Sequence, residues 1–543
     1  MSNKEFDIAA AVTERVAEEA KGEEKQPEKK TGEVSSKFVL ECLDAEALGD
    51  GMLYAEIHKE RFVYAKNSGQ WYVWDEHTWR RDDLDEAISA VETVAMRYAE
   101  EIAIREEEIT KAKKTHDDDY ISLITKRERA KITRLKKRIS SLRKRDGRNN
   151  CILFAHTNPV NQISITGSEF DLEPYLLGTP NGVINLKTGE LEPGRQSDYI
   201  TKRTSVPYLG LNLPTGLIDG TMKSIYDGDM EKIYFLQRLL GSALIGKVID
   251  HVFPVFIGRG RNGKSLIIER LRHVMGDYAG VVPAELMLDS TKQGSHNQSD
   301  PVMKSLKGLR LAVASETGEG RKFSSERVKW MTGGDTLSAR GLYDKYPESW
   351  TPTHMLILIT NHEPGAPAGD MAFWERCILI RHLLSFVSRE PEKDFERKAD
   401  PELPDKLAGA GSEFLTFLVI GCMEYQKQGL NPPESVRSST MEYREDEDFI
   451  GQFLEACTNS KQGSKATATE LHVAFSIWYR KNVNPNPRFT PSQKAFGSKL
   501  KAREEFPKSK SAGITYYNGI ELTPEYLDMV LKEASKGDGG DYQ

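Results

Sequence analysis

The 543-residue sequence has few cysteines, no long apolar run and no excess of positive charge. Its five cysteines are scattered, with no CxxC pair and no cluster with histidine, which argues against structural zinc and disulfides and fits a reducing compartment. No stretch approaches the roughly 18 apolar residues of a membrane span, and the N-terminus lacks an apolar signal-peptide core. We therefore expect a soluble, intracellular protein.

The net charge of −7 excludes a polycation, so any contact with DNA must come from local basic clusters. Residues 126–148 contain twelve basic and two acidic side chains, and residues 461–510 contain eleven basic and three acidic ones. The first cluster lies in a helical pattern and allows three interpretations: a solvated arm with a thin Ile/Leu stripe, an arm that faces DNA, or an arm between subunits.

The length is too great for one hydrophobic core and predicts several domains. GQWYVWDEHTW (69–79) is typical of a hairpin, the turns PNG and KTGE in 176–193 indicate a small β-meander, and GITYYNGIEL (513–522) suggests a final hairpin. The expected divisions are a disordered tail (1–36), an N-terminal α+β domain with the basic arm and a β linker (37–215), a nucleotide-binding domain (216–390), a helical connector (391–445), a winged-helix-like DNA-binding domain (446–525) and a second disordered tail (526–543).

The stretch 258–265 reads GRGRNGKS and matches G-x-x-x-x-G-K-[ST] in full. It follows HVFPVFI, a buried-strand pattern, and precedes SLIIERLRHVMG, an amphipathic helix expected to end at Gly276. Glycines let backbone N–H groups close around phosphates, and a helix N-terminus adds partial positive charge. In such a site Lys264 binds the β- and γ-phosphates of ATP, and the Ser265 hydroxyl ligates Mg²⁺. The candidate nucleotide-binding residues are Gly258, Arg259, Gly260, Arg261, Asn262, Gly263, Lys264 and Ser265.

Two later predicted strands end in polar side chains: 309–314 ends at Ser315 and Glu316, and 355–360 ends at Asn361. A hydrolytic P-loop enzyme orients its water and metal with a carboxylate at such a strand tip, and an amide there can contact the γ-phosphate. The order of phosphate loop, Glu and Asn therefore indicates ATP hydrolysis. Arg376 and Arg381 follow, and by themselves fit a structural role, as surface charge or with a carboxylate partner, about as well as a functional one.

The ordered set GxGxNGKS, RLAVASE, VKWMTGGDTLSAR, LILITN and FWERC resembles the superfamily 3 helicases. More narrowly, it is similar to the helicase half of phage and plasmid primases and of the poxvirus primase-helicase. GVINLKTGELEP and WYVWDEHTW are similar to the linker and N-terminal domain before that helicase, so the resemblance covers roughly residues 38–382. It implies an α/β multidomain fold: an AAA+ P-loop NTPase core, usually hexameric, with an α+β N-terminal domain and a C-terminal winged-helix-like domain.

The resemblance also implies roles for single residues. Glu316 is the catalytic carboxylate and shares Mg²⁺ with Ser265, Asn361 is the sensor, and Arg376 is the finger that reaches the neighbour's site. The loop from Arg340 through Lys345 and Tyr346 corresponds to the pore hairpin that grips single-stranded DNA. The full set of expected DNA-binding residues is Lys329, Arg340, Lys345, Tyr346, Lys494, Lys499 and Lys501.

Two features depart from that family. Many relatives place two acidic residues at the second strand tip, whereas Ser315 precedes Glu316 here, so metal binding would rest on Ser265, waters and a more distant acid. No primase domain is expected, because the acidic cluster HDDDY (116–120) lies in a charged helical stretch and is interpreted as a solvated loop. Priming would then come from a separate primase or polymerase.

Three hypotheses follow. The leading one is an ATP-driven, ring-forming replicative helicase of a phage, plasmid or other mobile element, which acts on single-stranded and forked DNA in the host-cell cytoplasm without a membrane. The second is an initiator that binds an origin, through major-groove contacts from 491–503, and melts it locally. The third is a degenerate ring whose ATP only clamps subunits together, against which intact Lys264, Glu316 and Arg376 argue.

Overall fold

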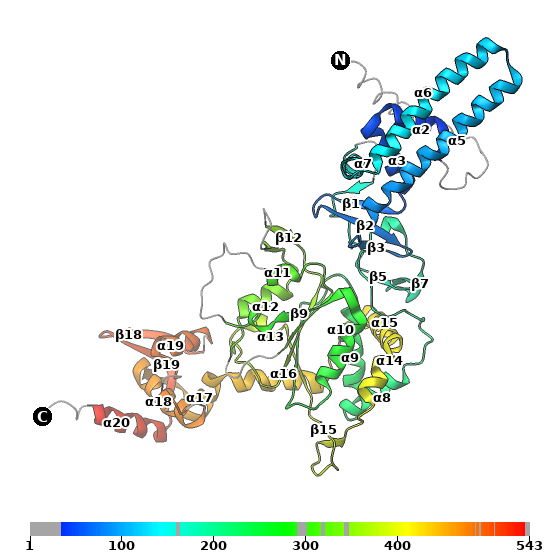
Figure 1. Ribbon diagram of the computed structural model, residues 1–543. Helices are drawn as coiled ribbons and strands as arrows, with labels where there is room; N and C mark the ends of the chain where they lie inside the picture. The colour runs from blue at the N-terminus through cyan, green and yellow to red at the C-terminus, as the bar shows by residue number, and fades with distance from the viewer. Residues whose placement is uncertain are drawn as a thin grey trace. The chain divides into compact units, whose positions relative to one another are not determined.

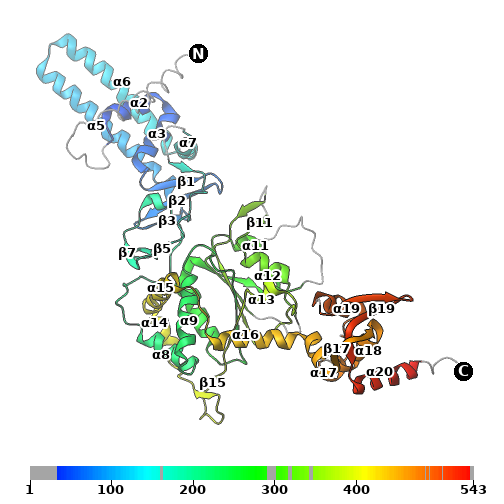
Figure 2. The ribbon, with the colours of Figure 1, turned by 180° about the vertical axis from the view of Figure 1, so that it is seen from behind.

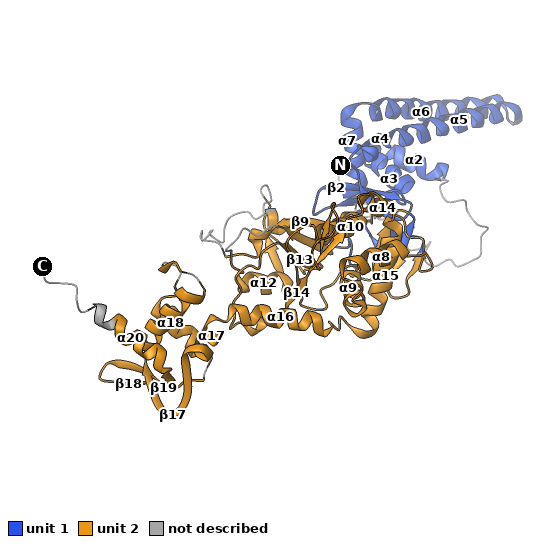
Figure 3. Ribbon diagram, turned by 90° about the horizontal axis from the view of Figure 1, so that it is seen from below, with its two compact units in different colours: residues 1–173, 181–183, 192–202 blue, residues 174–180, 184–191, 203–543 orange. Residues whose placement is uncertain are grey.

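The protein is a mixed α/β, multidomain structure, shown from two sides in Figures 1 and 2. The computed structural model describes residues 34–158, 163–289, 301–315, 321–341, 347–483, 485–487, 490–503 and 505–537. The chain divides into two compact units (Figure 3). The first extends to Glu173 and includes 181–183 and 192–202, and the second contains the other described residues.

The first unit combines a helical bundle with a small sheet of order β3-β2-β1-β4. The hairpin expected at 69–79 is confirmed: β2 and β3 pair antiparallel, with Trp74 opposite Trp79. The strands are β1 (Phe62–Ala65), β2 (Gln70–Asp75), β3 (Thr78–Arg81) and β4 (Ser164–Ile165). The helices are α2 (Ser36–Asp44), α3 (Glu46–His58), α4 (Glu86–Ser89), α5 (Val91–Thr115), α6 (Asp118–Leu142) and α7 (Arg145–Thr157).

The basic cluster predicted to be helical lies in α6 and the start of α7. In both views α5 and α6, each 25 residues long, lie side by side as an antiparallel pair (Figures 1 and 2). The interpretation of HDDDY as a loop is wrong for its second half. Asp117 caps α6 by accepting a hydrogen bond from the backbone N–H of Tyr120, and Asp118 and Asp119 lie in the first turn, where the helix N-terminus favours carboxylates.

Residues 174–202 are shared between the two units and form the predicted meander, a three-stranded sheet of order β5-β6-β7. Its strands are β5 (Leu176–Thr179), β6 (Gly182–Asn185) and β7 (Glu190–Glu192).

The second unit is built around five parallel strands of order β14-β8-β13-β10-β9. They are β8 (Phe253–Ile257), β9 (Ala279–Pro283), β10 (Leu311–Ser315), β13 (Met355–Thr360) and β14 (Cys377–Arg381). Alternate residues of each strand point to opposite faces, and these strands are apolar except at the last residues of β10, β13 and β14, so both faces need a helical cover. In β8, Phe256 belongs to one hydrophobic core, while Phe253 and Val255 belong to the other.

Helices cover both faces of this sheet. One core is closed by α8 (Gly216–Ile225), α9 (Met230–Ser242), α10 (Lys264–Met275), α14 (Leu403–Gly409) and α15 (Gly411–Gln428). The other is closed by α11 (Pro301–Ser305), α12 (Ser325–Thr332) and α13 (Met371–Trp374). Two small ribbons, β11 (Leu337–Ala339) with β12 (Glu348–Trp350) and β15 (Ser385–Val387) with β16 (Glu396–Lys398), complete this part.

Beyond α16 (Glu434–Glu447) the chain forms a separate small core around a sheet of order β17-β19-β18. Its elements are α17 (Phe449–Cys457), β17 (Thr458–Thr467), α18 (Ala468–Asn482), α19 (Gln493–Ala502), β18 (Lys508–Ser511), β19 (Ile514–Leu522) and α20 (Pro524–Gly537).

Two expectations for this C-terminal part are wrong. GITYYNGIEL is not a hairpin by itself: the turn lies at Ala512 and Gly513, both with positive φ, and Ile514–Leu522 is one strand. Residues 526–537, expected to be disordered, belong to α20, because Tyr526 and Val530 pack into the small core. The remainder of the expected tail, 538–543, lies outside the described residues, as does the expected tail up to residue 33.

Across the described ranges, no single helix is long and apolar enough to cross a membrane. The bent pair α14–α15 meets the length and composition of a span only when both helices are counted across a 74° break. Most of α15 is buried in the core of the second unit, as expected of a core helix.

Candidate functional site

The loop between β8 and α10 has the backbone shape that its glycines predicted. Gly260 and Gly263 have φ values of 92° and 83°, a region that glycine enters without steric cost, and Arg261 also has a positive φ of 51°. At Gly263 a Cβ atom would lie 2.6 Å from the Cδ1 of Ile225 in α8. Both the backbone conformation and the close approach of α8 therefore require glycine at this position. The helix α10 runs from Lys264 to Met275, and Gly276 is its C-cap, which confirms the predicted end of this helix.

The ammonium group of Lys264 lies at the centre of this loop and is surrounded by oxygen atoms. Its Nζ donates to the carbonyl of Gly258 at 2.5 Å, to Oδ1 of Asn262 at 3.3 Å and to Oδ1 of Asn361 at 3.2 Å. Lys264 is 3% exposed, and burial lowers its pKa. Since Asn361 follows β13, the strand next to β8, the parallel sheet brings the predicted lysine and the predicted amide together at one edge.

The side-chain amide of Asn262 lies inside the loop and contacts Lys264. Its Oδ1 also lies 3.4 Å from the backbone nitrogen of Lys264, and its Nδ2 is buried without a hydrogen-bond partner among the described residues. A Cβ at Gly258 would lie 2.2 Å from that Nδ2 and 2.6 Å from the carbonyl oxygen of His382. Gly258 therefore permits the asparagine and the end of β14 to pack against the loop.

The sequence did not predict a buried polar cluster next to the loop, formed by His382, Tyr226 and Lys232. His382, directly after β14, pairs through Nε2 with the hydroxyl of Tyr226 at 2.9 Å, and Lys232 donates to the carbonyl of Arg381 at 2.9 Å. Burial, with the nearby charges of Lys232 and Lys264, lowers the pKa of His382 to about 3. The histidine is thus neutral and adds no positive charge beside Lys264. These residues come from three distant segments, and no spacing in the sequence connects them.

The remaining residues of the candidate site differ in their placement. Ser265 is exposed in the first turn of α10, and Arg259 and Arg261 are exposed on the loop, where the carbonyl of Arg261 accepts a hydrogen bond from Phe386 N at 2.7 Å. Glu316, predicted as the catalytic carboxylate and metal ligand, lies outside the described residues.

Arg376 lies away from the Lys264 loop of its own chain. It precedes β14, whose first residue Cys377 pairs with Phe253, whereas the loop follows Ile257 at the other end of β8. Five residues of extended strand separate the two edges, roughly 16 Å. Its Nη1 donates to the carbonyl of Ala372 at 2.7 Å. Arg381, in contrast, ends β14 at the loop edge and forms an ion pair with Glu363 at 2.7 Å, so it has a carboxylate partner.

The predicted DNA-binding residues fall into three groups. Lys329 is held by Asp370 at 2.8 Å, an ion pair that joins α12 to the start of α13. Arg340 is exposed after β11, whereas Lys345 and Tyr346 lie outside the described residues. The three residues of the C-terminal part, Lys494, Lys499 and Lys501, are exposed on α19, and desolvation lowers the pKa of Lys499.

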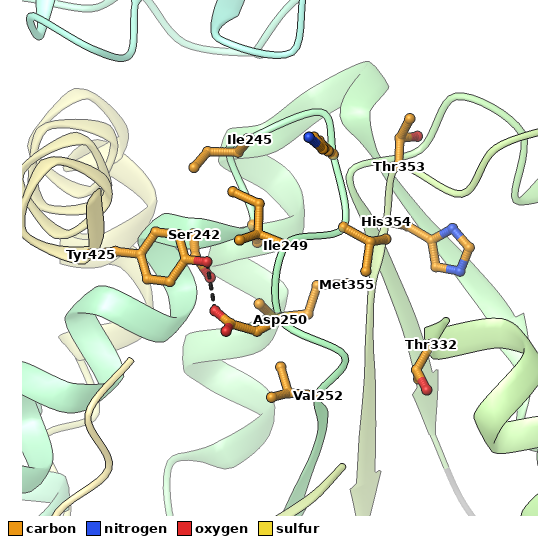
Figure 4. Close-up of a pocket in the computed structure, with 13 residues that line it drawn as sticks. Ser242, Ile245, Ile249, Asp250, Val252, Thr332, Thr353, His354, Met355 and Tyr425 are labelled. Carbon is orange, nitrogen blue, oxygen red and sulfur yellow. Dashed lines mark hydrogen bonds between the residues drawn. The ribbon is translucent and has the colours of Figure 1, made fainter. Parts of the chain in front are cut away.

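A cavity of about 30 Å³ lies beside the start of β13, at the sheet edge away from the loop (Figure 4). The hydroxyl of Tyr425 donates to the carboxylate of Asp250 at 2.5 Å on its wall, and His354 also lines it. This volume has room for about two water molecules. No residue of the Lys264 loop lines it, so it is separate from the candidate site.

Comparison with known proteins finds viral relatives and one matching family model. Residues 51–244 match the family model described as D5 N terminal like. A putative helicase, L207/L206, of Acanthamoeba polyphaga mimivirus is 27% identical over 446 residues, which are 78% of this chain and 45% of the relative. The putative helicase 121R of Invertebrate iridescent virus 3 is 25% identical over 57% of this chain and 35% of its own length. The putative primase C962R of African swine fever virus is 23% identical over 58% of this chain and 34% of its own.

These matches show that the chain is similar to D5-like primase-helicases. The chain spans less than half the length of these three relatives. Among solved structures, the apo C-terminal region of NrS-1 is similar over 65% of this chain and 95% of that one, with 13% identity and a TM-score of 0.34. A similarity that slight supports no conclusion about fold or function.

Proposed function

We propose that the protein is an ATP-dependent DNA helicase of superfamily 3 that serves the replication of a virus, phage, plasmid or other mobile element. One observation carries the proposal. The ammonium of Lys264 meets the amide oxygen of Asn361 at 3.2 Å, on a GRGRNGKS loop that opens a helix at the carboxyl edge of a parallel sheet. Open α/β sheets bind ligands at that edge, and this loop starts from the strand at which the strand order reverses.

The described residues fit ATP with Mg²⁺. The N-terminus of the twelve-residue helix α10 directs its free backbone N–H groups into the loop, and the buried Nδ2 of Asn262 is a further donor without a partner among the described residues. Lys264 would bind the β- and γ-phosphates, and Ser265, with Glu316, would hold the metal ion. Mg²⁺ would supply neutralisation of the charge on the phosphates. Asn361 would orient the attacking water or the γ-phosphate.

The proposal includes a ring, usually of six subunits, in which Arg376 would act on the site of a neighbour. Because this arginine lies at the sheet edge away from Lys264 in its own chain, a role as a finger requires the site of a neighbouring subunit. An arginine supplied in trans stabilises charge in the transition state and couples hydrolysis to assembly.

DNA contact is assigned to two regions. The ribbon β11–β12 with Arg340, and with Lys345 and Tyr346, would form the pore hairpin on single-stranded DNA. The C-terminal part from α17 to β19 would act as a winged-helix-like domain that presents Lys494, Lys499 and Lys501 to forked DNA. The domain boundaries expected from the sequence, and a separate primase or polymerase as partner, belong to the same proposal.

A second candidate function is an origin-binding initiator that melts DNA locally. It is favoured by α19, whose exposed lysines lie on one short helix beside the basic strand β18. In that case the C-terminal part would bind a preferred duplex sequence. Footprinting on DNA from the same replicon separates the two functions, because a motor needs no preferred site.

Strand separation on a forked DNA with ATP tests the proposal. Wild type should unwind the fork, and Lys264→Ala and Arg376→Ala should each abolish unwinding, whereas the exposed-residue controls Lys223→Ala and Arg272→Ala should keep it. A mixture of the two inactive variants should regain part of the ATPase, because some mixed sites combine an intact lysine with an intact arginine. ATPase activity without strand separation by wild type would favour the initiator, and activity in Arg376→Ala would refute the shared site.

A further inference from the structure

The basic residues of the arm 126–148 in the first unit fall into two sets, one paired with carboxylates and one unpaired. Of the twelve basic residues between 126 and 148, six form ion pairs with carboxylates of the same unit. The pairs are Arg127 and Lys131 with Glu128, Arg134 with Asp44, Arg138 with Asp50, and Arg143 and Arg148 with Glu92. The pair of Arg138 with Asp50, which is 1% exposed, ties α6 to α3. These six cations are structural.

The other six cations are exposed, and no carboxylate of the described residues lies within 4.0 Å of them. They are Lys126, Arg129, Lys136, Lys137, Lys144 and Arg145. We call the first four, which belong to α6, the basic stripe. At about 100° per residue they fall within roughly 100° of the helix circumference, on the half turned away from the buried residues Ile132, Leu135 and Leu142.

Within the basic stripe no exposed carboxylate separates the cations, although Asp118 and Asp119 lie in the first turn of the same helix. From residue 120 to residue 145 the only acidic side chain is Glu128, which is 5% exposed and engaged with the arginines and lysine around it. The stripe spans the twelve residues 126–137, roughly 16 Å along the helix axis. Four unpaired cations on one face of a helix, in a chain whose net charge is −7, are complementary to a polyanion.

The composition of the surface selects between two polyanions. Sites for single-stranded nucleic acid combine cations with aromatic rings on which bases stack. Residues 121–150 contain no Phe, Tyr, Trp or His. Duplex DNA needs no stacking partner, because it presents a phosphate charge about every 1.7 Å of its axis to a straight row of cations.

We propose that the basic stripe of α6 is a docking surface for the phosphate backbone of duplex DNA. Binding there is independent of base sequence, because phosphate contacts position a protein without reading bases. It is also independent of ATP, since the stripe belongs to the first unit and the Lys264 loop to the second. The proposal adds a contact to the proposed helicase, and a failure of either leaves the other standing.

Fluorescence anisotropy with labelled duplex and single-stranded DNA, without nucleotide, tests the proposal on the full chain. The stripe variant carries Lys126→Gln, Arg129→Gln, Lys136→Gln and Lys137→Gln, all on exposed helical positions where glutamine is well tolerated. The matched control removes the same charge from the same unit with Lys37→Gln, Lys59→Gln, Lys113→Gln and Lys114→Gln. Circular dichroism checks that both variants keep their helix content.

The stripe variant should bind the duplex at least tenfold more weakly. Its plot of log affinity against log salt should be shallower by about 3 to 4, since each lost contact with B-DNA removes about 0.9 from the slope. The control should match wild type. Equal affinities of stripe variant and control would overturn the proposal, and so would equal losses on single-stranded and duplex DNA. Unchanged DNA binding with a smaller native mass would instead assign the stripe to a contact between copies of the chain.

Discussion

The Nζ atom of Lys264 lies 3.2 Å from the Oδ1 atom of Asn361, although 97 residues separate them in the chain. One residue opens the helix after β8, and the other follows β13, the strand beside it. The distance between these two atoms therefore depends both on the conformation of the glycine-rich loop and on the position of the neighbouring strand end. Four predictions follow from this site and its surroundings.

Replacing Asn361 should separate binding of ATP from its hydrolysis. Asn361→Ala removes one of three acceptors of Lys264 but leaves Gly258 and Asn262, so the loop should still bind nucleotide. The proposed role at the γ-phosphate or water is lost, and kcat for ATP should fall by about 10² to 10³, as for loss of one positioned polar group. Steady-state ATPase and equilibrium binding of a fluorescent ATP analogue measure the two effects.

Asn361→Asp is the sharper version of this test. A carboxylate at this place would hold Lys264 as an ion pair and repel the γ-phosphate, so ATP affinity should fall more than in Asn361→Ala. The neighbouring exposed residue provides a control, His362→Ala, which should behave as wild type. An unchanged kcat in both Asn361 variants would remove Asn361 from the reaction.

Gly263 and Gly260 should respond differently to alanine. Both have positive φ, which costs roughly 1 kcal/mol for a residue with a Cβ. Only at Gly263 would that Cβ meet Ile225, at 2.6 Å, whereas nothing lies within 4 Å at Gly260. Gly263→Ala should therefore lose nucleotide affinity more strongly, and Ile225→Ala added to it should restore part of the loss. Isothermal titration with ATP compares the three proteins, and equal affinities of the two single variants would contradict the packing of α8 on the loop.

Stability should fall as the solution is acidified below neutral pH. Burial lowers the pKa of His382 to about 3 and the pKa of His354 to about 4, against 6.5 for an unperturbed histidine. In the unfolded chain these groups take up protons below pH 6.5, and in the folded chain they do not until pH 3 to 4. Their contribution is thus fully present above pH 6.5 and is lost as pH falls through this window, by up to about 1.4 kcal/mol per pH unit for each histidine.

Urea unfolding between pH 7.5 and pH 4.5 measures this dependence. His354→Leu removes one titrating group, and its free energy of unfolding should vary less steeply with pH than that of wild type. His273→Gln changes an exposed histidine and should leave the slope unchanged. Identical slopes for wild type and His354→Leu would show that His354 is protonated in the folded protein.

The thiols should be inert in the folded protein. All five cysteines are free and buried, and burial raises the pKa of Cys377 and of Cys422 to about 12 and that of Cys457 to about 11. Thiolate is the reactive form, so a disulfide reagent at pH 8 should titrate no thiol within minutes and five after unfolding in guanidinium. Rapid reaction of one thiol in the native protein would locate a segment that opens readily.

The local part of the site could be predicted, because strand, glycine-rich turn and helix follow each other within about twenty residues. The predicted strands HVFPVFI and 355–360 agree with β8 and β13. The predicted helix end at Gly276 agrees with α10, and GRGRNGKS forms the loop between β8 and α10. Asn361 could also be placed, since carboxyl ends of parallel strands meet at one edge.

Side-chain partners far apart in sequence could not be predicted. The pairing of His382 with Tyr226 spans 156 residues, and the ion pair of Lys329 with Asp370 spans 41. Each depends on which faces of α8, α12 and β14 pack together, and hydrophobic periodicity does not specify the partner of a polar residue. For the same reason the partner of Lys329 was not predicted, and this residue was expected to bind DNA. The helix α20 was not predicted, because its charged residues are typical of a solvated tail, although Tyr526 and Val530 form an apolar side that packs into the small core.

The three oxygen acceptors around Lys264 also bear on how the loop releases a ligand. When phosphates leave, the ammonium does not remain as a bare buried cation, because Gly258, Asn262 and Asn361 replace the lost contacts. In the proposed helicase, release of nucleotide would therefore leave no buried, unpaired charge behind. In that role the site would favour turnover over tight retention of its product.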